Sequence, residues 1–189
     1  MLKNIPEAVG RALSGTRAGL DGVALHRIEA PSGIIVTSPA FAPDATMPVR
    51  FTADGEGVSP PLRWTGVPPG AKAVALLVED ADSPTPHPLV HAIIHALPGT
   101  DGGIDEGAMP GPGHDGDVAA GRNSFLRAGW LPPDSPPGHG PHRYVFQVFA
   151  LDIAPDAATS PGREALVGTM AGHVLAKGAM VGLFDRGGG

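Results

Sequence analysis

Glycine and proline constrain this chain more than any other feature of its sequence. There are 28 glycines and 22 prolines among 189 residues, a share at which low-complexity disorder becomes a candidate. They follow no three-residue period, which excludes collagen, and both residues disfavour helix interiors. Hydrophobic residues make up 42% and charged residues 17%, which suits a packed core better than a disordered chain. The sequence therefore predicts a folded protein with many strands joined by structured loops.

Charge and composition exclude several classes of partner and location. The net charge is −6 and the isoelectric point is about 5.7, and no basic run is present, so we expect no binding to nucleic acid. There are no cysteines, which excludes disulfides and thiolate chemistry and fits a cytoplasmic location. No apolar stretch approaches the roughly 18 residues of a membrane span. Charged residues also interrupt any apolar segment near the N-terminus, so no signal peptide is expected.

The first 30 residues show a helical spacing of apolar side chains. A repeat of three and four predicts an amphipathic helix over residues 4–29, formed by Ile5, Val9, Leu13, Leu20 and Val23. Four glycines in this segment each weaken a helix by about 1 kcal/mol, so it needs a partner surface. We expect it to dock on its own domain or on a second copy of the chain, as in a homodimer. The predicted organisation is an N-terminal helix and linker over residues 1–32, followed by one domain over residues 33–189.

Beyond residue 33 the pattern favours short strands. The candidates are Ile34–Thr37, Arg50–Thr52, Ala73–Val78, Val90–Leu97 and Tyr144–Leu151. The third is apolar on both faces, which is typical of a buried central strand. Residues 98–141 are rich in glycine and proline, and their apolar side chains, Phe125, Leu126, Trp130 and Leu131, indicate a packed loop. A last helix is predicted over residues 160–181, from the spacing of Leu166, Met170, Val174 and Met180.

Two carboxylates close the strand that begins at Ala73. Side chains alternate along a strand, so Asp80 and Asp82 are expected on one face, about 7 Å apart. The alternative is an ordinary polar turn, in which aspartate is common.

Histidines mark the starts of two other predicted strands. His142 and Tyr144 share one face of the strand near residue 144, and His91 stands at the head of the strand after residue 89. Each could instead be a buried structural side chain. If the three strand ends converge, carboxylates can hold an imidazole in one tautomer and raise its pKa. Imidazolium and phenol groups then donate to an anion, and glycine-rich loops add backbone N–H groups. This chemistry suits a phosphate monoester or a sulfate.

Other chemistries fit the sequence less well. A metal site is conceivable from Asp80, Asp82, His91 and His142, but no recognised metal-binding spacing is present, so we expect neither metal nor cofactor. Residues 111–116 match G-x-G-x-x-G, yet no strand precedes them and a proline interrupts them, so we expect no dinucleotide. Acids and histidines could serve a hydrolase, but the sequence shows no obvious nucleophile.

Several stretches together resemble the phosphatidylethanolamine-binding protein family, and in particular its bacterial Raf-kinase-inhibitor-like branch of the YbhB/YbcL type. They occur in the family's order: Ser38–Phe41, Phe51–Trp64, Glu79–Pro84, Gly121–Ser124, Pro136–Tyr144 and Gly172–Ala176. The resemblance runs from about residue 33 to residue 186.

The resemblance implies a mostly β fold, an antiparallel β-sandwich of a large sheet packed on a smaller one, with a few peripheral helices besides the extra N-terminal one. It also implies a small anion pocket. Its motifs fall on Asp80, Asp82, Pro84, His91, His142 and Tyr144, and its pocket loop on the stretch from Gly129 through Pro132 to Pro137. The function implied is non-enzymatic binding of a small anionic ligand, such as phosphate, sulfate or a phosphoethanolamine-like group. The alternative is a regulator that binds a kinase or protease through the 98–141 loops.

Overall fold

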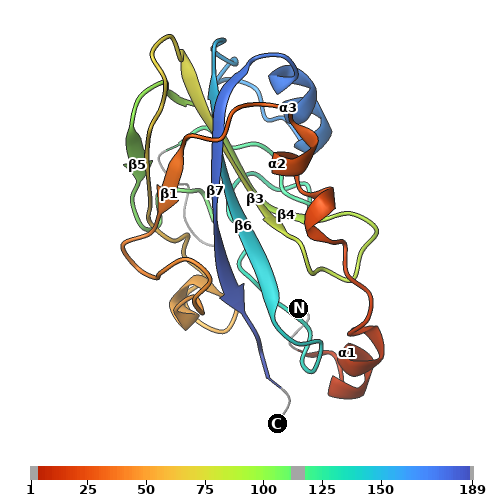
Figure 1. Ribbon diagram of the computed structural model, residues 1–189. Helices are drawn as coiled ribbons and strands as arrows, with labels where there is room; N and C mark the ends of the chain where they lie inside the picture. The colour runs from red at the N-terminus through yellow and green to blue at the C-terminus, as the bar shows by residue number, and fades with distance from the viewer. Residues whose placement is uncertain (1–3, 112–117, 188–189) are drawn as a thin grey trace.

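Two antiparallel sheets form the body of the protein (Figure 1). The computed structural model describes residues 4–111 and 118–187. The large sheet has the order β4 (Leu89–Pro98), β3 (Ala73–Asp80), β6 (His142–Leu151) and β7 (Val174–Phe184). The small sheet has the order β1 (Ile35–Thr37), β2 (Leu62–Thr65) and β5 (Gly102–Ile104). This arrangement confirms the predicted mostly β sandwich.

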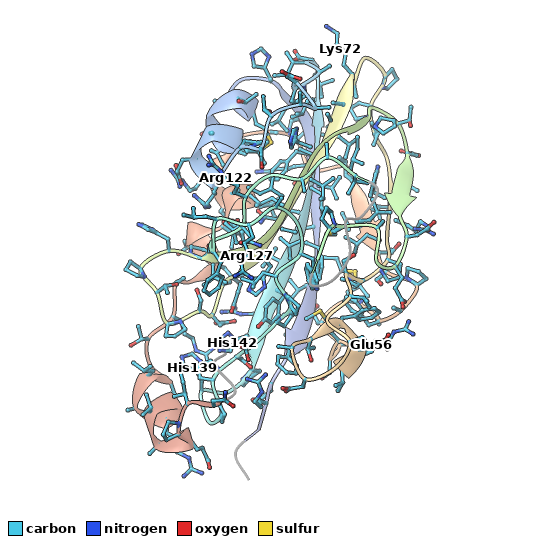
Figure 2. The ribbon with its side chains drawn as sticks, turned by 180° about the vertical axis from the view of Figure 1, so that it is seen from behind. Glu56, Lys72, Arg122, Arg127, His139 and His142 are labelled. Atoms are coloured by element: carbon cyan, nitrogen blue, oxygen red, sulfur yellow. The ribbon has the colours of Figure 1, made fainter. Side chains whose placement is uncertain are left out.

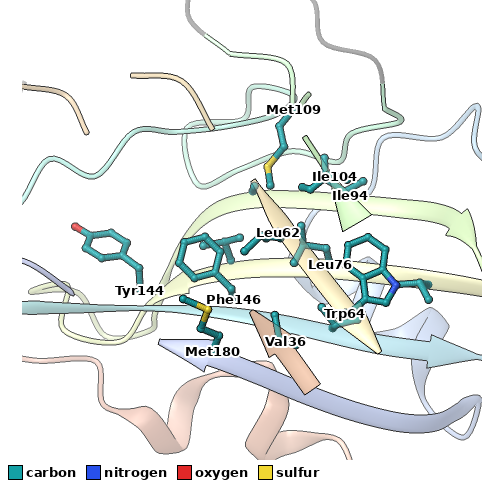
Figure 3. Packing of buried hydrophobic residues seen from close by; sticks show 14 of the residues in the cluster. Val36, Leu62, Trp64, Leu76, Ile94, Ile104, Met109, Tyr144, Phe146 and Met180 are labelled. Carbon is teal, nitrogen blue, oxygen red and sulfur yellow. The ribbon is translucent and has the colours of Figure 1, made fainter. Parts of the chain in front are cut away.

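The main core lies between the two sheets (Figure 3). The small sheet contributes Val36, Leu62 and Trp64, and the large sheet contributes Leu76, Ile94, Phe146 and Met180. Tyr144 lies at one end of this cluster, beside Phe146. One end of the core therefore lies at the start of β6, where His142 and Tyr144 were predicted from the sequence.

A second apolar layer covers the other face of the large sheet. The short helices α2 (Ala24–Arg27) and α3 (Arg163–Met170) pack there. The layer includes Ala24, Ile28, Leu166 and Met170 from the helical side, and Ala75, Leu77, Ile93 and Phe149 from the sheet. Every residue of β3 is buried as a result, which confirms the prediction of a central strand with two apolar faces.

A buried carboxylate fastens these helices to the sheet. Glu79 is fully buried and accepts hydrogen bonds from Arg163 Nε at 2.6 Å, the amide of Ala24 at 2.8 Å and Gln147 Nε2 at 2.8 Å. One side chain of β3 thus holds both α2 and α3. Because burial of a charge requires such partners, these contacts fix where the helices lie.

The predicted helix over residues 4–29 was wrong in extent. The segment forms α1 (Glu7–Leu13), a 3-10 turn η2 (Leu20–Gly22) and α2. Between them the amides of Ala18 and Gly19 donate to the carbonyls of Ser83 and Ala81, at 3.1 and 2.7 Å, instead of to the helix. Gly19 has a φ of +87°, which glycine adopts without strain. Tertiary hydrogen bonds therefore replaced the helical ones.

The predicted helix over residues 160–181 was also wrong beyond its first half. α3 ends at Met170, Gly172 turns the chain with a φ of +78°, and β7 then pairs along the whole of β6. The apolar spacing that fitted a helix also fits a strand whose alternate residues Ala176, Met180 and Phe184 face the core. Without β7, the backbone groups of β6 that face it would have no hydrogen-bond partners. This favours a strand over a helix for the residues of β7.

Smaller differences concern the loops. Arg50–Thr52 is not a strand: Val49–Phe51 forms the 3-10 turn η3, which begins after Pro48 and is closed by a hydrogen bond from the Thr52 hydroxyl to the Val49 carbonyl at 2.8 Å. In the long loop Trp130 is buried as predicted, whereas Phe125 and Leu126 are exposed. The glycine motif at residues 111–116 lies outside the described residues except for Gly111. Within the described ranges, no helix combines the length and apolarity needed to cross a bilayer.

Candidate functional site

The end of β3 meets the start of β6 at one pair of side chains. The two strands are antiparallel, with Asp80 opposite Tyr144, so the carboxylate of Asp80 reaches the ring of His142. His142 Nδ1 donates to Asp80 Oδ2 at 2.7 Å, and both side chains are buried. Asp80 Oδ1 accepts the amide of Asp82 at 2.8 Å, which fixes the turn after β3. The predicted pairing of an acid with an imidazole is present here.

The other nitrogen of His142 is also engaged. His142 Nε2 lies 2.8 Å from His139 Nδ1, and His139 Nε2 lies 3.2 Å from the carbonyl oxygen of Thr16. Figure 2 shows the two histidines side by side near the start of β6. Asp80, His142, His139 and Thr16 thus form one hydrogen-bonded chain that ends on the N-terminal segment.

The chain of hydrogen bonds from Asp80 to Thr16 requires a fixed number of N–H groups. Both of its ends, a carboxylate and a carbonyl, only accept, so its three contacts need three N–H groups. Two neutral imidazoles carry two. The chain is therefore fully bonded only when it holds one additional proton. Burial, and then the neighbouring His142, lower the pKa of His139 below its ordinary 6.5.

His91 reaches the site through an irregularity in β4. The register with β3 passes from Val78↔Ala92 to Glu79↔Val90, which leaves His91 without an opposite residue. Such a bulge re-aims a side chain. His91 consequently turns to the same side as Ala92, where its ring meets Tyr144 edge-on at 5.0 Å and lies 6.2 Å from the ring of Trp130.

One ring nitrogen of His91 is left without a partner. Nδ1 donates to the carbonyl oxygen of Leu131 at 2.6 Å, whereas Nε2 is buried and makes no hydrogen bond. Trp130 Nε1 and Ser135 Oγ, both from the loop that holds His91, are also buried without a partner. Buried polar atoms are rarely left unsatisfied. Among the described residues the one further buried side-chain atom of this kind is His95 Nδ1, so three of the four lie on His91 or on this loop.

Burial sets the ionisation of the rings. It lowers the pKa of His91 below 6.5, opposed by the carboxylate of Asp80. Burial, assisted by Asp80, raises the pKa of Tyr144 well above 10. The free site therefore holds a neutral imidazole and a neutral phenol at pH 7, and the phenol keeps its O–H as a donor.

Asp82 does not join this group, contrary to the expected shared face. β3 ends at Asp80, so strand alternation stops before Asp82. Its carboxylate instead accepts two bonds from the Arg143 guanidinium, each at 2.7 Å, and pairs with Arg17 at 2.9 Å. Burial alone would raise the pKa of Asp82, but these arginine bonds outweigh it and lower the pKa from 3.8 to about 2.

A hollow of about 290 Å³ lies beside Asp82, lined by Arg17, Asp82, Pro141, Arg143 and Leu183.

The remaining predicted residues, Gly129, Pro132 and Pro84, lie in loops. Gly129 is packed so closely on Pro110 that a Cβ atom on Gly129 would overlap the Pro110 carbonyl. The carbonyl of Gly129 accepts a hydrogen bond from Asn123 Nδ2 at 3.2 Å. Pro132 packs against Gly57. Pro84, half-buried, follows the turn after Asp82. These three residues therefore shape the loops. Among the described residues no group of three or more acids and histidines could hold a metal ion.

Comparison with known proteins identifies a family. A family model described as phosphatidylethanolamine-binding protein matches residues 37–185. The chain belongs to the phosphatidylethanolamine-binding protein family. It is 38% identical over 150 residues to a UPF0098 protein of Methanothermobacter thermautotrophicus, covering 78% of this chain and 96% of the relative. The division of this family member into an N-terminal segment over residues 1–32 and a domain over residues 33–189 stays a prediction.

Solved structures resemble the chain over most of its length. One is described as a putative phosphatidylethanolamine-binding protein homologue from Chlamydia trachomatis, with a TM-score of 0.73, 30% identity, and coverage of 82% of this chain and 99% of the other. Another, E. coli YbcL, is described as a member of the mammalian PEBP family, with a TM-score of 0.72, 28% identity and the same coverage.

Several residues of the site in this member of the phosphatidylethanolamine-binding protein family were not predicted from the sequence. His139 lies three positions before His142, and that spacing was the one available signal. Trp130 was predicted to be packed but not to adjoin His91. Arg17 lies 65 positions from Asp82 in the sequence, so no local pattern connects them. Arg186, near the C-terminus, holds the loop beside His91 through Asp134 at 2.8 Å and the Ser135 carbonyl at 2.5 Å.

Proposed function

We propose that this protein is a non-enzymatic binding protein that holds a small anion, a phosphate or a phosphoryl headgroup, at His91. The observation that carries the proposal is the buried, unpartnered Nε2 atom of His91. The centroid of the Tyr144 ring lies 5.0 Å from that of the His91 ring, and Tyr144 contributes a neutral phenol. The description of the matching family model and that of the Chlamydia trachomatis structure mention phosphatidylethanolamine binding and support the same ligand class.

The tautomer of His91 determines how the anion would be held. Nδ1 carries a hydrogen, because it donates to the carbonyl of Leu131. In the neutral ring Nε2 therefore has no hydrogen, and it becomes a donor only in the imidazolium form. An anion at Nε2 supplies the opposite charge that the buried imidazolium lacks, so binding and protonation favour each other.

Catalysis is not part of the proposal. A nucleophilic hydroxyl is activated by a hydrogen bond to a neighbouring base. In the part of the chain that the structure describes, the hydrogen bonds of the histidine rings go to backbone carbonyls, carboxylates or another histidine, and none goes to a serine or threonine hydroxyl. The cytoplasmic location, the homodimer and the kinase or protease partner stay predictions.

Sulfate is the sharpest probe of the site, because a phosphate monoester changes its own charge near pH 6. Burial keeps the pKa of His91 low in the free protein, so binding above that pKa takes up one proton. We expect the sulfate affinity to rise about tenfold for each unit by which the pH falls, until the free imidazole itself is protonated. Isothermal titration calorimetry between pH 5 and pH 8 measures this slope. Inorganic phosphate and O-phosphoethanolamine, titrated in parallel, separate a site for free phosphate from one for a phosphorylated headgroup.

A matched pair of variants tests the role of His91. In His91→Asn the side-chain amide can keep the bond to Leu131 but offers no imidazolium, and we expect sulfate binding to be lost. His95→Asn is the control. His95 lies four residues along β4, is buried, bonds the carbonyl of Thr159 through one nitrogen and leaves the other unpartnered. Equal sulfate binding by His91→Asn and the wild-type protein, or an affinity that does not change with pH, would contradict the proposal.

A further inference from the structure

The rings of His91 and His142 both lie beside Tyr144, with centroids 5.0 and 6.4 Å from that of Tyr144, so His142 is a second imidazole near an anion at His91. Another side chain already contacts the ring nitrogen of His142 that is not bonded to Asp80. His142 Nε2 lies 2.8 Å from His139 Nδ1, and the two ring centroids are 4.7 Å apart. The remaining nitrogen, Nδ1, is bonded to Asp80. An anion therefore gains a bond from His142 only if the ring of His139 moves away.

His139 is held in this place by the N-terminal arm, which we define as residues 7–19. Thr16 accepts a hydrogen bond from His139 Nε2 through its carbonyl at 3.2 Å. Arg17 donates to the carbonyl of His139 at 3.1 Å and to that of Pro141 at 2.9 Å, and its guanidinium also pairs with Asp82 at 2.9 Å. The arm thus fixes both the ring and the backbone of His139.

The arm also joins the two segments that flank the site. The amides of Ala18 and Gly19 donate to the carbonyls of the turn after β3. At its other end Gly10 packs against Pro137, on the loop before β6, so tightly that a Cβ atom would overlap the Pro137 carbonyl oxygen. Figure 1 shows α1 beside this loop. The arm therefore bridges the turn at residues 81–83 and the loop at residues 137–141.

The attachment of the arm is weak compared with that of the core. In α1 only Gly10 is buried, and Val9 is 43% exposed. The arm is held mainly by backbone contacts and by Arg17, whose side chain is 31% exposed. Segments with few buried apolar contacts open at low free-energy cost. We therefore expect the arm to open at a lower free-energy cost than unfolding of the sandwich.

We propose that the N-terminal arm is a lid that keeps His139 on His142 and so withholds the second histidine from an anion. This inference rests on the proposed function, because it concerns access to the same site. In the closed form, among the described residues, the histidine beside Tyr144 that keeps an unpartnered ring nitrogen is His91. Opening of the arm releases His139 and adds His142 to the donors. For binding that uses both histidines, the apparent dissociation constant is then the intrinsic one divided by the open fraction.

Two glycines of the arm provide a matched test that changes no charge. In Gly10→Ala the new methyl group overlaps Pro137 and pushes α1 off its loop, whereas in Gly15→Ala it meets nothing within 4 Å. We expect Gly10→Ala to bind sulfate about fivefold more tightly at pH 6, because the open fraction increases, and Gly15→Ala to bind as the wild-type protein does. A third variant, His139→Ala, frees His142 directly and is expected to bind at least as tightly as Gly10→Ala.

Hydrogen exchange of the Ala18 and Gly19 amides reports the position of the arm without any ligand. These amides should exchange faster in Gly10→Ala and not in Gly15→Ala. Faster exchange with an unchanged sulfate affinity would overturn the lid, while sulfate binding by the wild-type protein would leave the anion site intact. Unchanged exchange in Gly10→Ala would overturn the role of the Pro137 contact. An absence of sulfate binding in every form would overturn the anion site and the lid with it.

Discussion

Replacing Arg163 by methionine is expected to lower the free energy of unfolding by about 3–5 kcal/mol. Arg163 Nε lies 2.6 Å from the carboxylate of Glu79, which is fully buried, and the Arg163 side chain is only 11% exposed. Methionine fills much of the same volume but leaves the carboxylate with neutral donors alone. A buried charge without its counter-charge is costly. Urea denaturation followed by circular dichroism at pH 7 measures the loss.

Two further variants identify the cause of that loss. Arg27→Met removes an exposed pair with Glu164 at 3.4 Å and is expected to cost less than about 1 kcal/mol. The double variant Glu79→Gln/Arg163→Met removes both charges and should recover most of the stability, because no isolated charge stays buried. If Arg163→Met cost no more than Arg27→Met, the pair with Glu79 would not hold α3 on the sheet.

Gly178→Ala is expected to destabilise the protein by about 3 kcal/mol, the upper range for overpacking a tight site. Gly178 lies in β7 where the strand passes the segment before β1, and a Cβ atom there would overlap the carbonyl oxygen of Ile34. The neighbouring Lys177 carbonyl accepts from the amides of Gly33 and Ile34 at 3.1 and 3.3 Å. The added methyl group would therefore separate the two sheets at the point where their backbones are bonded.

Gly168→Ala is the control for this substitution. Gly168 lies in α3, and a Cβ atom there meets nothing within 4 Å. Alanine is better than glycine in a helix interior by about 0.5–1 kcal/mol, so this variant should gain stability. Thermal unfolding of both variants tests the pair. Equal changes in stability for Gly178→Ala and Gly168→Ala would show that the segment at Ile34 moves to accept the methyl group without loss of stability.

The strands that could be predicted are those whose pattern has one interpretation. Ala73–Val78 is a short, uniformly apolar run that is typical of a buried strand, and β3 occupies Ala73–Asp80. The apolar residues after Leu166 fit both a helix and a strand, and they formed both, α3 and then β7. The short strands β2 and β5 were not predicted. β5 contains two glycines, whose lack of a side chain gives no alternation to detect.

The site could be predicted as far as strand order allowed. Asp80 and His142 stand at ends of strands that pair, so their meeting follows from the antiparallel register. His91 faces them only because of a bulge in β4, which no side-chain pattern revealed. Asp82 does not lie with Asp80 and His142, because β3 ends at Asp80, two residues before the end that the alternation argument assumed.

The sequence by itself determined the class of fold, the family and the identity of the polar residues at the strand ends. Local patterns of burial and short motifs are sufficient for these, because they depend on neighbours in the chain. Only the tertiary structure decided which of those residues keeps an unpartnered atom. Thr16 bonds His139 and Arg17 pairs with Asp82 across more than 60 residues of sequence, and partners at that separation depend on how the whole chain packs. The glycines and prolines that first suggested disorder lie partly in the loop around His91 and in the turn beside Asp82, where they shape the site.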